Sequence, residues 1–259
     1  MEVVAEFATC RGEVEIIKWL IRDAPIKKDP NGQIIKGMGL KSKSISLIQS
    51  CLVGLQEIAK VLLESGADVH YDNSQALCMS SKYGHIACVK LLVEYGADIH
   101  VDEEYPLVHS CRQGHFEVAA YLISQGAMIH ARRDCALHWA SEGGHSRIVS
   151  LLIDNGADIH SNEDHALRWS AVHGHNRIVE ILLHQGADVH AMDNYALRNA
   201  VKMRHLNIIT TLLKWGADKT ANNDECMKWA AEHGDGEVLE ILLKSYSREE
   251  TMKHSTTFF

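Results

Sequence analysis

The sequence predicts an all-α solenoid of about eight helix-turn-helix units, and two repeated phrases predict it. A five-residue phrase beginning Gly-Ala recurs at an unbroken 30-residue step, as GADVH at 66–70, GADIH at 96–100, GAMIH at 126–130, GADIH at 156–160, GADVH at 186–190 and GADKT at 216–220. A Gly-His pair keeps the same step at 84–85, 114–115, 144–145 and 174–175. A fixed period of this length is the signature of stacked supersecondary units that share one core.

The composition agrees with a helical protein. Apolar residues make up 46% of the 259 positions and aromatic residues 6%, so a core can form, while long strand-like patterns are scarce. The net charge of −8 argues against a general nucleic-acid binder, and no apolar run approaches the ~18 residues that a membrane span needs. The seven cysteines contain no Cys-x-x-Cys pair, which favours free thiols in a reducing, intracellular compartment, most simply the cytoplasm.

The phrases divide residues 1–246 into eight expected units of one repeat domain. Their approximate bounds are 1–24, 40–69, 70–99, 100–129, 130–159, 160–189, 190–219 and 220–246. Residues 25–39 interrupt the period, and their Asp-Pro-Asn-Gly sequence predicts an inserted hairpin loop. Residues 247–259 form a tail in which the capping box Ser247-x-x-Glu250 predicts a short capping helix.

Each unit is expected to hold two short helices, as residues 164–185 illustrate. The carboxylate of Asp164 is placed to cap the first helix, a position shared by Ser74, Asp134, Asn194 and Asp224. Small apolar residues then recur at helical spacing until Gly174, which favours a left-handed C-cap. A second apolar stripe, Ile178, Val179, Leu182 and Leu183, runs to Gly186. The polar segment after Gly186 is expected to be a loop that leads to the next unit.

The stretch ALRWSAVHGHNRIVEILLHQGADVH at 166–190 resembles an ankyrin repeat, and the resemblance extends over residues 1 to about 246. The family's usual unit has 33 residues and opens its first helix with Thr-Pro-Leu-His. Here the unit has 30 residues, and only Pro106-Leu107 and Leu137-His138 keep parts of that tetrapeptide. The resemblance therefore implies short or absent β-hairpin fingers, a form similar to ankyrin proteins of large DNA viruses, which act inside the host cell.

Two rows of histidines invite comparison with a metal-binding ladder. Zinc needs its nitrogen ligands about 2.0–2.1 Å from one ion, whereas equivalent residues on packed neighbouring helices lie roughly 8–10 Å apart. We therefore expect no metal and no cofactor. The resemblance implies hydrogen-bonding roles for the row that closes each unit (His70, His100, His130, His160 and His190) and for the Gly-His row (His85, His115, His145, His175 and His205). The family is also known for hydroxylation at the closing position, and Leu62, Asp68, Val69 and His70 fit that pattern.

In ankyrin proteins the fingers and first helices line a concave groove that binds a partner protein. The resemblance thus implies a binding face made of Tyr105, Trp139, His165, Arg168, Trp169, His173, Tyr195, Arg198 and Trp229. Trp, Tyr and Arg are enriched in interface hot spots. The three tryptophans share one place in the unit, so they are either anchors for the partner or parts of the framework. Arg168 and Arg198 would give the groove basic edges, and a partner with apolar anchors and some acidic residues is expected.

A second candidate surface is the basic segment 25–43, which carries five lysines and one aspartate and leaves −12 for the rest of the chain. Its lysines are Lys27, Lys28, Lys36, Lys41 and Lys43. This segment either contacts an acidic partner or is a solvated loop. The apolar Val3, Val4 and Phe7 are unusual for a terminal unit. We expect a monomer, with a dimer through this apolar unit or an upstream segment as alternatives.

These observations predict a non-catalytic protein-interaction scaffold that binds neither nucleic acid nor membrane. One alternative is a substrate-targeting or adaptor subunit whose effector domain lies on another chain. A more remote alternative is a histidine-rich metal-binding protein or enzyme, although no nucleophile with a paired base and no phosphate loop is evident in the sequence.

Overall fold

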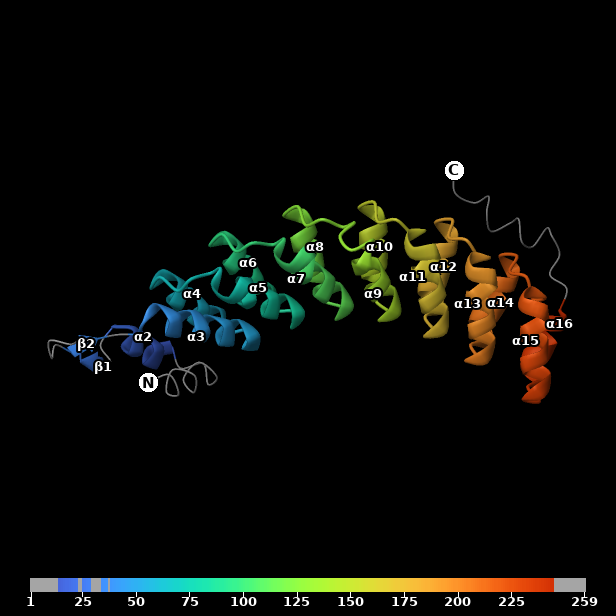
Figure 1. Ribbon diagram of the computed structural model, residues 1–259, viewed down its shortest axis with the longest axis horizontal. Coiled ribbons are helices and arrows are strands. Elements are labelled where there is room, and N and C mark those ends of the chain that lie inside the picture. Colours follow the sequence, from blue (N-terminus) through green and yellow to red (C-terminus); the bar gives the residue numbers. More distant parts are fainter. Residues whose placement is uncertain (1–13, 23–24, 29–33, 37, 245–259) are drawn as a thin grey trace. The chain divides into compact units, whose positions relative to one another are not determined.

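The computed structural model describes residues 14–22, 25–28, 34–36 and 38–244 (Figure 1). The chain divides into two compact units, residues 1–128 and 129–259, and each is described by itself. Both are all-α repeat structures, and one short antiparallel hairpin stands apart from the repeats. It pairs β1 (Pro25–Lys28) with β2 (Ile34–Lys36), in the segment where the sequence predicts an inserted hairpin.

In the first unit, α2 is followed by three helix pairs. The helices are α2 (Val14–Arg22), α3 (Leu40–Val53), α4 (Gln56–Glu64), α5 (Tyr71–Lys82), α6 (Ile86–Glu94), α7 (Val101–Arg112) and α8 (Phe116–Ser124). The first helix of each pair contacts the first helix of the next, so that α3, α5 and α7 form one layer. The second helices α4, α6 and α8 form the other layer, and α2 packs against α4.

The second unit repeats this arrangement with four helix pairs. They are α9 (Cys135–Glu142) with α10 (Ser146–Asp154), α11 (Ser161–Val172) with α12 (Asn176–His184), α13 (Ala191–Lys202) with α14 (Leu206–Lys214), and α15 (Ala221–Glu232) with α16 (Gly236–Leu243). Helices α9, α11, α13 and α15 form the layer of first helices, and α10, α12, α14 and α16 form the layer of second helices.

The core lies between the two layers of each unit, where the repeated apolar positions meet. In the repeat of α11 and α12, Leu167, Ala171, Ile178, Val179 and Leu182 are each at most 1% exposed. A single helix pair cannot enclose such a stripe, so the stripe becomes buried only when neighbouring repeats stack on it.

The segment between consecutive repeats departs from the expected loop. Three consecutive residues adopt the left-handed conformation, with φ between 48° and 70°, in every repeat from α5 onward: 72–74, 102–104, 132–134, 162–164, 192–194 and 222–224. None of these turns contains a strand within the part of the chain described, 38–244. A tight left-handed turn thus stands where ankyrin repeats usually carry a β-hairpin finger.

The predicted helix N-caps are wrong, and the left-handed turn is the reason. Asp164 has φ of 52° and lies inside that turn, as Ser74, Asn194 and Asp224 lie in theirs, while Asp134 precedes α9 and its side chain accepts no hydrogen bond from that helix. The Asp164 Oδ1 instead accepts from the backbone N–H of Asp188, at 2.8 Å, near the end of the same repeat. Asp134 and Asn194 accept in the same way from Asp158 and Asp218. This side chain therefore ties the opening of a repeat to its closing turn.

Several predictions concern residues outside the described part of the chain. The capping helix at 247–259 and the apolar positions Val3, Val4 and Phe7 belong to this group, as do the side chains of Lys27, Lys28 and Lys36. In the described segments, every helix is too short or too polar to cross a membrane.

Candidate partner-binding face

The Gly-His row locks neighbouring repeats together, as the resemblance implies. In four members of the row the imidazole Nε2 bonds a backbone carbonyl 33 residues earlier, in the preceding repeat, at 2.8–3.0 Å: His85 with Leu52, His115 with Lys82, His175 with Glu142 and His205 with Val172. The ring lies so close to the glycine of that repeat that a Cβ on Gly84 would come within 2.4 Å of the His115 Nδ1. The paired glycine also has φ of +79°, which favours glycine on its own account.

The closing-row histidines also make structural hydrogen bonds. In four of them Nδ1 bonds the side chain four residues later: His100 with Glu104 at 2.5 Å, His130 with Asp134 at 3.0 Å, His160 with Asp164 at 3.1 Å and His190 with Asn194 at 3.2 Å. The aspartate two residues earlier accepts from the backbone N–H of His70, His100, His160 and His190 at 2.9 Å. Among the described residues no three His, Cys, Asp or Glu side chains are arranged to hold a metal ion.

The predicted binding residues of the second unit lie along the outer side of its first helices. We call this surface the first-helix face and define it by the exposed and half-buried side chains of residues 131–143, 161–173, 191–203 and 221–233, together with Arg168. Tyr105 belongs to the first unit, where its half-buried ring stacks on His109 at 3.8 Å between centroids.

A column of aromatic rings runs along α11. His165, Trp169 and His173 follow at four-residue spacing with ring centroids 5.6 Å apart, and His138 of α9 lies 4.4 Å from His165. A similar pair, Trp229 with His233 at 4.2 Å, follows α15. Trp139, Trp169 and Trp229 are all half-buried, so each both packs on its own repeat and keeps part of its surface open to a partner.

Burial keeps the central histidines of this column uncharged. It lowers the pKa of His165 to about 4, with smaller contributions from His138 and Arg168, and it also lowers the pKa of His138. His138 and His165 are therefore neutral aromatic rings at pH 7.

Arg168 does not form the basic edge that the sequence suggested. Its side chain is buried, with the residue only 7% exposed, and it donates from Nε to the carbonyl of Glu163 and from Nη2 to the carbonyl of Asn162, both at 2.8 Å. Its guanidinium also lies over the Tyr195 ring, 5.3 Å from the centroid. Three left-handed residues leave these carbonyls without helical partners, and Arg168 supplies the missing donors.

Arg198 is engaged in the same way, and its charge is neutralised. It donates to the carbonyls of Asp193 and Met192, and its Nη1 lies 2.6 Å from Glu225 Oε2. Lys202 approaches the other oxygen of Glu225 at 2.5 Å. Hydrogen bonds from Lys202, Arg198 and Asn222 lower the Glu225 pKa to about 2, so the carboxylate stays ionised. The expected basic groove is thus corrected to a face whose arginines are already occupied.

One geometric rule unites these contacts and could have been found from the sequence. The side chain at position 138, 168 or 198 meets the side chain 27 residues later, on the next repeat, giving the pairs His138–His165, Arg168–Tyr195 and Arg198–Glu225. The complementary chemistry of the pair at 198 and 225 is visible in the sequence once this offset is known. The sequence did not lead us to expect a pair between Arg198 and Glu225, because each repeat position was considered separately.

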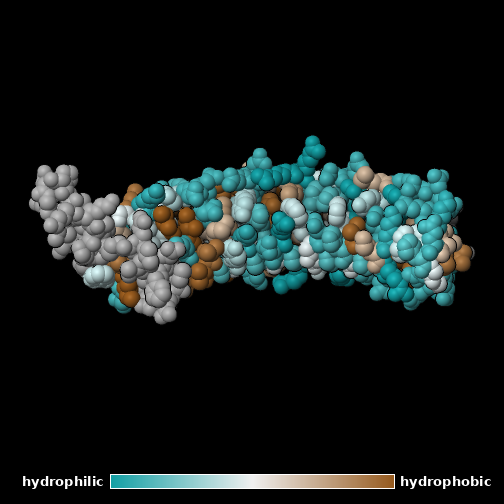
Figure 2. Space-filling view, turned by 60° about the horizontal axis from the view of Figure 1, so that its bottom comes forward, coloured by the Kyte–Doolittle hydropathy of each residue, from teal (hydrophilic) through white to brown (hydrophobic). Residues whose placement is uncertain are grey.

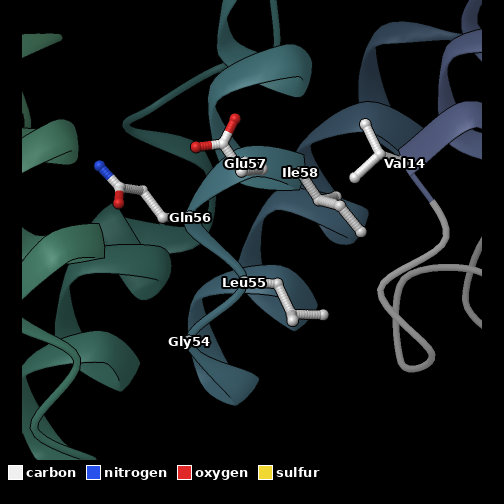
Figure 3. Close-up of a pocket in the computed structure, with 6 residues that line it drawn as sticks. All are labelled: Val14, Gly54, Leu55, Gln56, Glu57 and Ile58. Atoms are coloured by element: carbon white, nitrogen blue, oxygen red, sulfur yellow. The ribbon is translucent and has the colours of Figure 1, made fainter.

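The first unit carries a different kind of surface. Figure 2 shows apolar surface gathered over this unit, where the exposed large side chains include Ile16, Trp19, Leu52 and Val53. A hollow of about 300 Å³ opens nearby, lined by Val14 of α2 and by residues 54–58 at the start of α4 (Figure 3). Residues 54 and 55 of this repeat are Gly-Leu instead of Gly-His, so Leu55 stands where the later repeats have the histidine that bonds the preceding repeat.

A family model described as "Ankyrin repeats (3 copies)" matches residues 5–103, 47–133, 100–163, 130–193 and 167–253. Among solved structures, the chain is similar to the crystal structure of the human ASB11 ankyrin repeat domain, with a TM-score of 0.67 and 23% sequence identity. The similarity covers 76% of this chain and 96% of the ASB11 domain, and at this identity it concerns the fold alone. No curated protein matches the chain.

Proposed function

Because this chain belongs to the ankyrin-repeat family, we propose that it is a non-catalytic scaffold that binds a partner protein through the first-helix face of its second unit. Ankyrin repeats are generally protein-interaction modules, and this face corresponds to the surface that lines the family's concave groove. The observation that carries the proposal is the aromatic column formed by half-buried His165 and Trp169 and exposed His173, held on the repeat lattice. Trp and Tyr on a preorganised surface are the side chains that contribute most to protein interfaces.

The state of the cysteines supports a role without catalysis. Burial raises the pKa of Cys78 and Cys111 to about 12 and that of Cys226 to about 11. A hydrogen bond with Cys51 lowers the pKa of Cys88, but that residue is fully buried, and a reactive cysteine needs both a lowered pKa and access to solvent. The six cysteines in the described part of the chain are free thiols, which also supports an intracellular location.

Site-specific photo-crosslinking tests the proposal. A benzophenone amino acid would replace Met203 or Lys228, which are exposed on the first-helix face, and Asp154 or Glu240, which are exposed on second helices, would carry it as controls. After irradiation in cell lysate, we expect one discrete adduct from positions 203 and 228 and none from 154 and 240. Adducts formed only from the second helices would overturn the choice of face.

An adaptor role is the second candidate, and one observation favours it. Ile16, Trp19 and Val53 are 38–47% exposed on the first unit, which suits burial against another chain. In an adaptor this surface would hold an effector subunit, while a monomeric scaffold would leave it open. Size-exclusion chromatography with light scattering of the full chain, beside a Trp19→Ser variant, distinguishes a dimer formed through this surface from a monomer.

We further infer that the chain is a short-finger variant, similar to ankyrin proteins of large DNA viruses. The 30-residue period and the left-handed turns at the finger positions support this inference. Insertion of three residues between positions 162 and 163 tests it, because the longer finger of a 33-residue repeat should then fold without loss of helicity.

A further inference from the structure

We infer that the segment bound by the first-helix face is basic, carrying arginine or lysine side chains rather than acidic ones. The inference rests on the proposed function and specifies the chemistry of the partner. It reverses the expectation that Arg168 and Arg198 would attract acidic residues.

The first step is that the face has no free arginine in its centre. Arg168 and Arg198 each donate two hydrogen bonds to the carbonyls of their own left-handed turn. Glu225 also holds Arg198 and Lys202 in ion pairs. An incoming carboxylate would have to compete with these hydrogen bonds and ion pairs for the two guanidinium groups.

The second step is that the charges which remain exposed from residue 161 onward are mostly acidic. In residues 161–173, 191–203 and 221–233, the exposed ionic side chains are Glu163, Asp193, Asp224 and Glu232, against Lys228, whereas the first repeat of the face, 131–143, exposes Arg132 and Arg133. No ion pair within the described segments engages any of these four carboxylates. The second unit from 129 to 244 also has sixteen acidic and twelve basic residues, a net charge of −4.

The third step is that the structure fixes the backbone that carries two of these carboxylates. The carbonyls of Glu163 and Asp193 accept the Nε donors of Arg168 and Arg198 at 2.8 and 2.9 Å. The two exposed side chains therefore leave the backbone at equivalent places on adjacent repeats.

The fourth step is that an aromatic column lies on the same face. His165 and His173 flank Trp169, and the Tyr195 ring already lies within 5.3 Å of the guanidinium of Arg168 and 6.0 Å of that of Arg198. Guanidinium and ammonium groups are attracted to aromatic rings, with tryptophan the best. Carboxylates beside aromatic rings thus suit a partner that presents arginine or lysine.

Defined peptides test this inference. Three labelled peptides of equal length would carry arginine, glutamine or glutamate at every third position and leucine and serine elsewhere. Fluorescence anisotropy would measure their binding to the parent chain, to the double variant Glu163→Gln/Asp193→Asn and to the control Asp154→Asn/Glu240→Gln. The control makes the same change in net charge on the second helices, and both variants replace exposed side chains.

We expect the arginine peptide to bind tightest at low salt, and the Glu163→Gln/Asp193→Asn variant to weaken it about tenfold while the control stays near the parent. Tighter binding of the glutamate peptide than of the arginine peptide would overturn the inference. An equal loss of arginine-peptide affinity in both double variants would also overturn it, because it would show that binding depends only on the net charge of the chain. Failure of all three peptides to bind would overturn it as well. The photo-crosslinks at positions 203 and 228 judge the proposed function separately, because they do not depend on the partner's charge.

Discussion

Acid should destabilise the second unit through His165, and replacing this histidine with tyrosine should remove that effect. Tyrosine is a conservative choice because Tyr105 and Tyr195 occupy the equivalent place in other repeats. Burial lowers the pKa of His165 from 6.5 to about 4 in the folded chain. Between these values the unfolded chain binds the proton and the folded chain does not, so the stabilising contribution is complete above pH 6.5 and is lost as the pH falls toward 4.

The size of the effect follows from the shift. At 1.36 kcal/mol per unit, a fall from 6.5 to about 4 corresponds to at most about 3 kcal/mol. The His165 ring is only half-buried, so solvent screening reduces the expected value to about 1–2 kcal/mol. Carboxylates also titrate in this range, and the comparison with His165→Tyr subtracts them because both chains share them.

The assay is urea unfolding followed by circular dichroism at several pH values between 7.5 and 4. The free energy of unfolding of the parent should fall about 1–2 kcal/mol further than that of His165→Tyr over this interval. Parallel pH profiles for the two chains would refute the reasoning, because they would show that His165 titrates alike in the folded and unfolded states.

Three further predictions concern the repeat lattice and are measured by the same unfolding assay. Met192→Gly should stabilise the chain by about 0.5–1 kcal/mol because Met192 has φ of 49°, a conformation that glycine adopts without strain. The control Met203→Gly, where φ is −89°, should destabilise it, and a loss of stability in both variants would contradict backbone strain in the turn. Gly174→Ala should cost about 1–2 kcal/mol more than Gly186→Ala, since both have positive φ but only the first places a Cβ within 2.9 Å of a histidine ring; equal costs would show that the ring moves aside freely. Leu182→Ala should cost about 2–5 kcal/mol and loosen adjoining repeats before distant ones in hydrogen exchange, whereas uniform loss of protection would argue against nearest-neighbour stacking.

The structure changed the expected chemistry of the binding face more than its location. Trp169, His173 and Tyr195 lie on the face that the resemblance indicated, and their role in binding stays a prediction. Arg168 and Arg198 lie there as well, yet their donors are occupied by the backbone of the left-handed turns. The arginines in the sequence therefore led us to expect more unpaired positive charge on this face than the structure has.

The sequence by itself determined the elements whose signals are local or periodic. The 30-residue step, the apolar stripes and the glycines at helix ends were enough to predict the helix pairs and the all-α repeat fold. The Gly-His row was also predictable through the resemblance, because the glycine and the ring occupy fixed places in every copy. Such features repeat, and repetition makes a weak local signal strong.

Tertiary structure decided what depends on the contact between one repeat and the next. Asp164 has the composition of an N-cap, but three left-handed residues turn its carboxylate toward Asp188, 24 residues later. The pairing of Arg198 with Glu225 and the lowered pKa of His165 likewise arise from side chains 27 residues apart that stacking brings together. Ion pairing and side-chain pKa values depend on burial and on the distances between side chains. The sequence of a single repeat does not reveal these, because they arise only when the repeats stack.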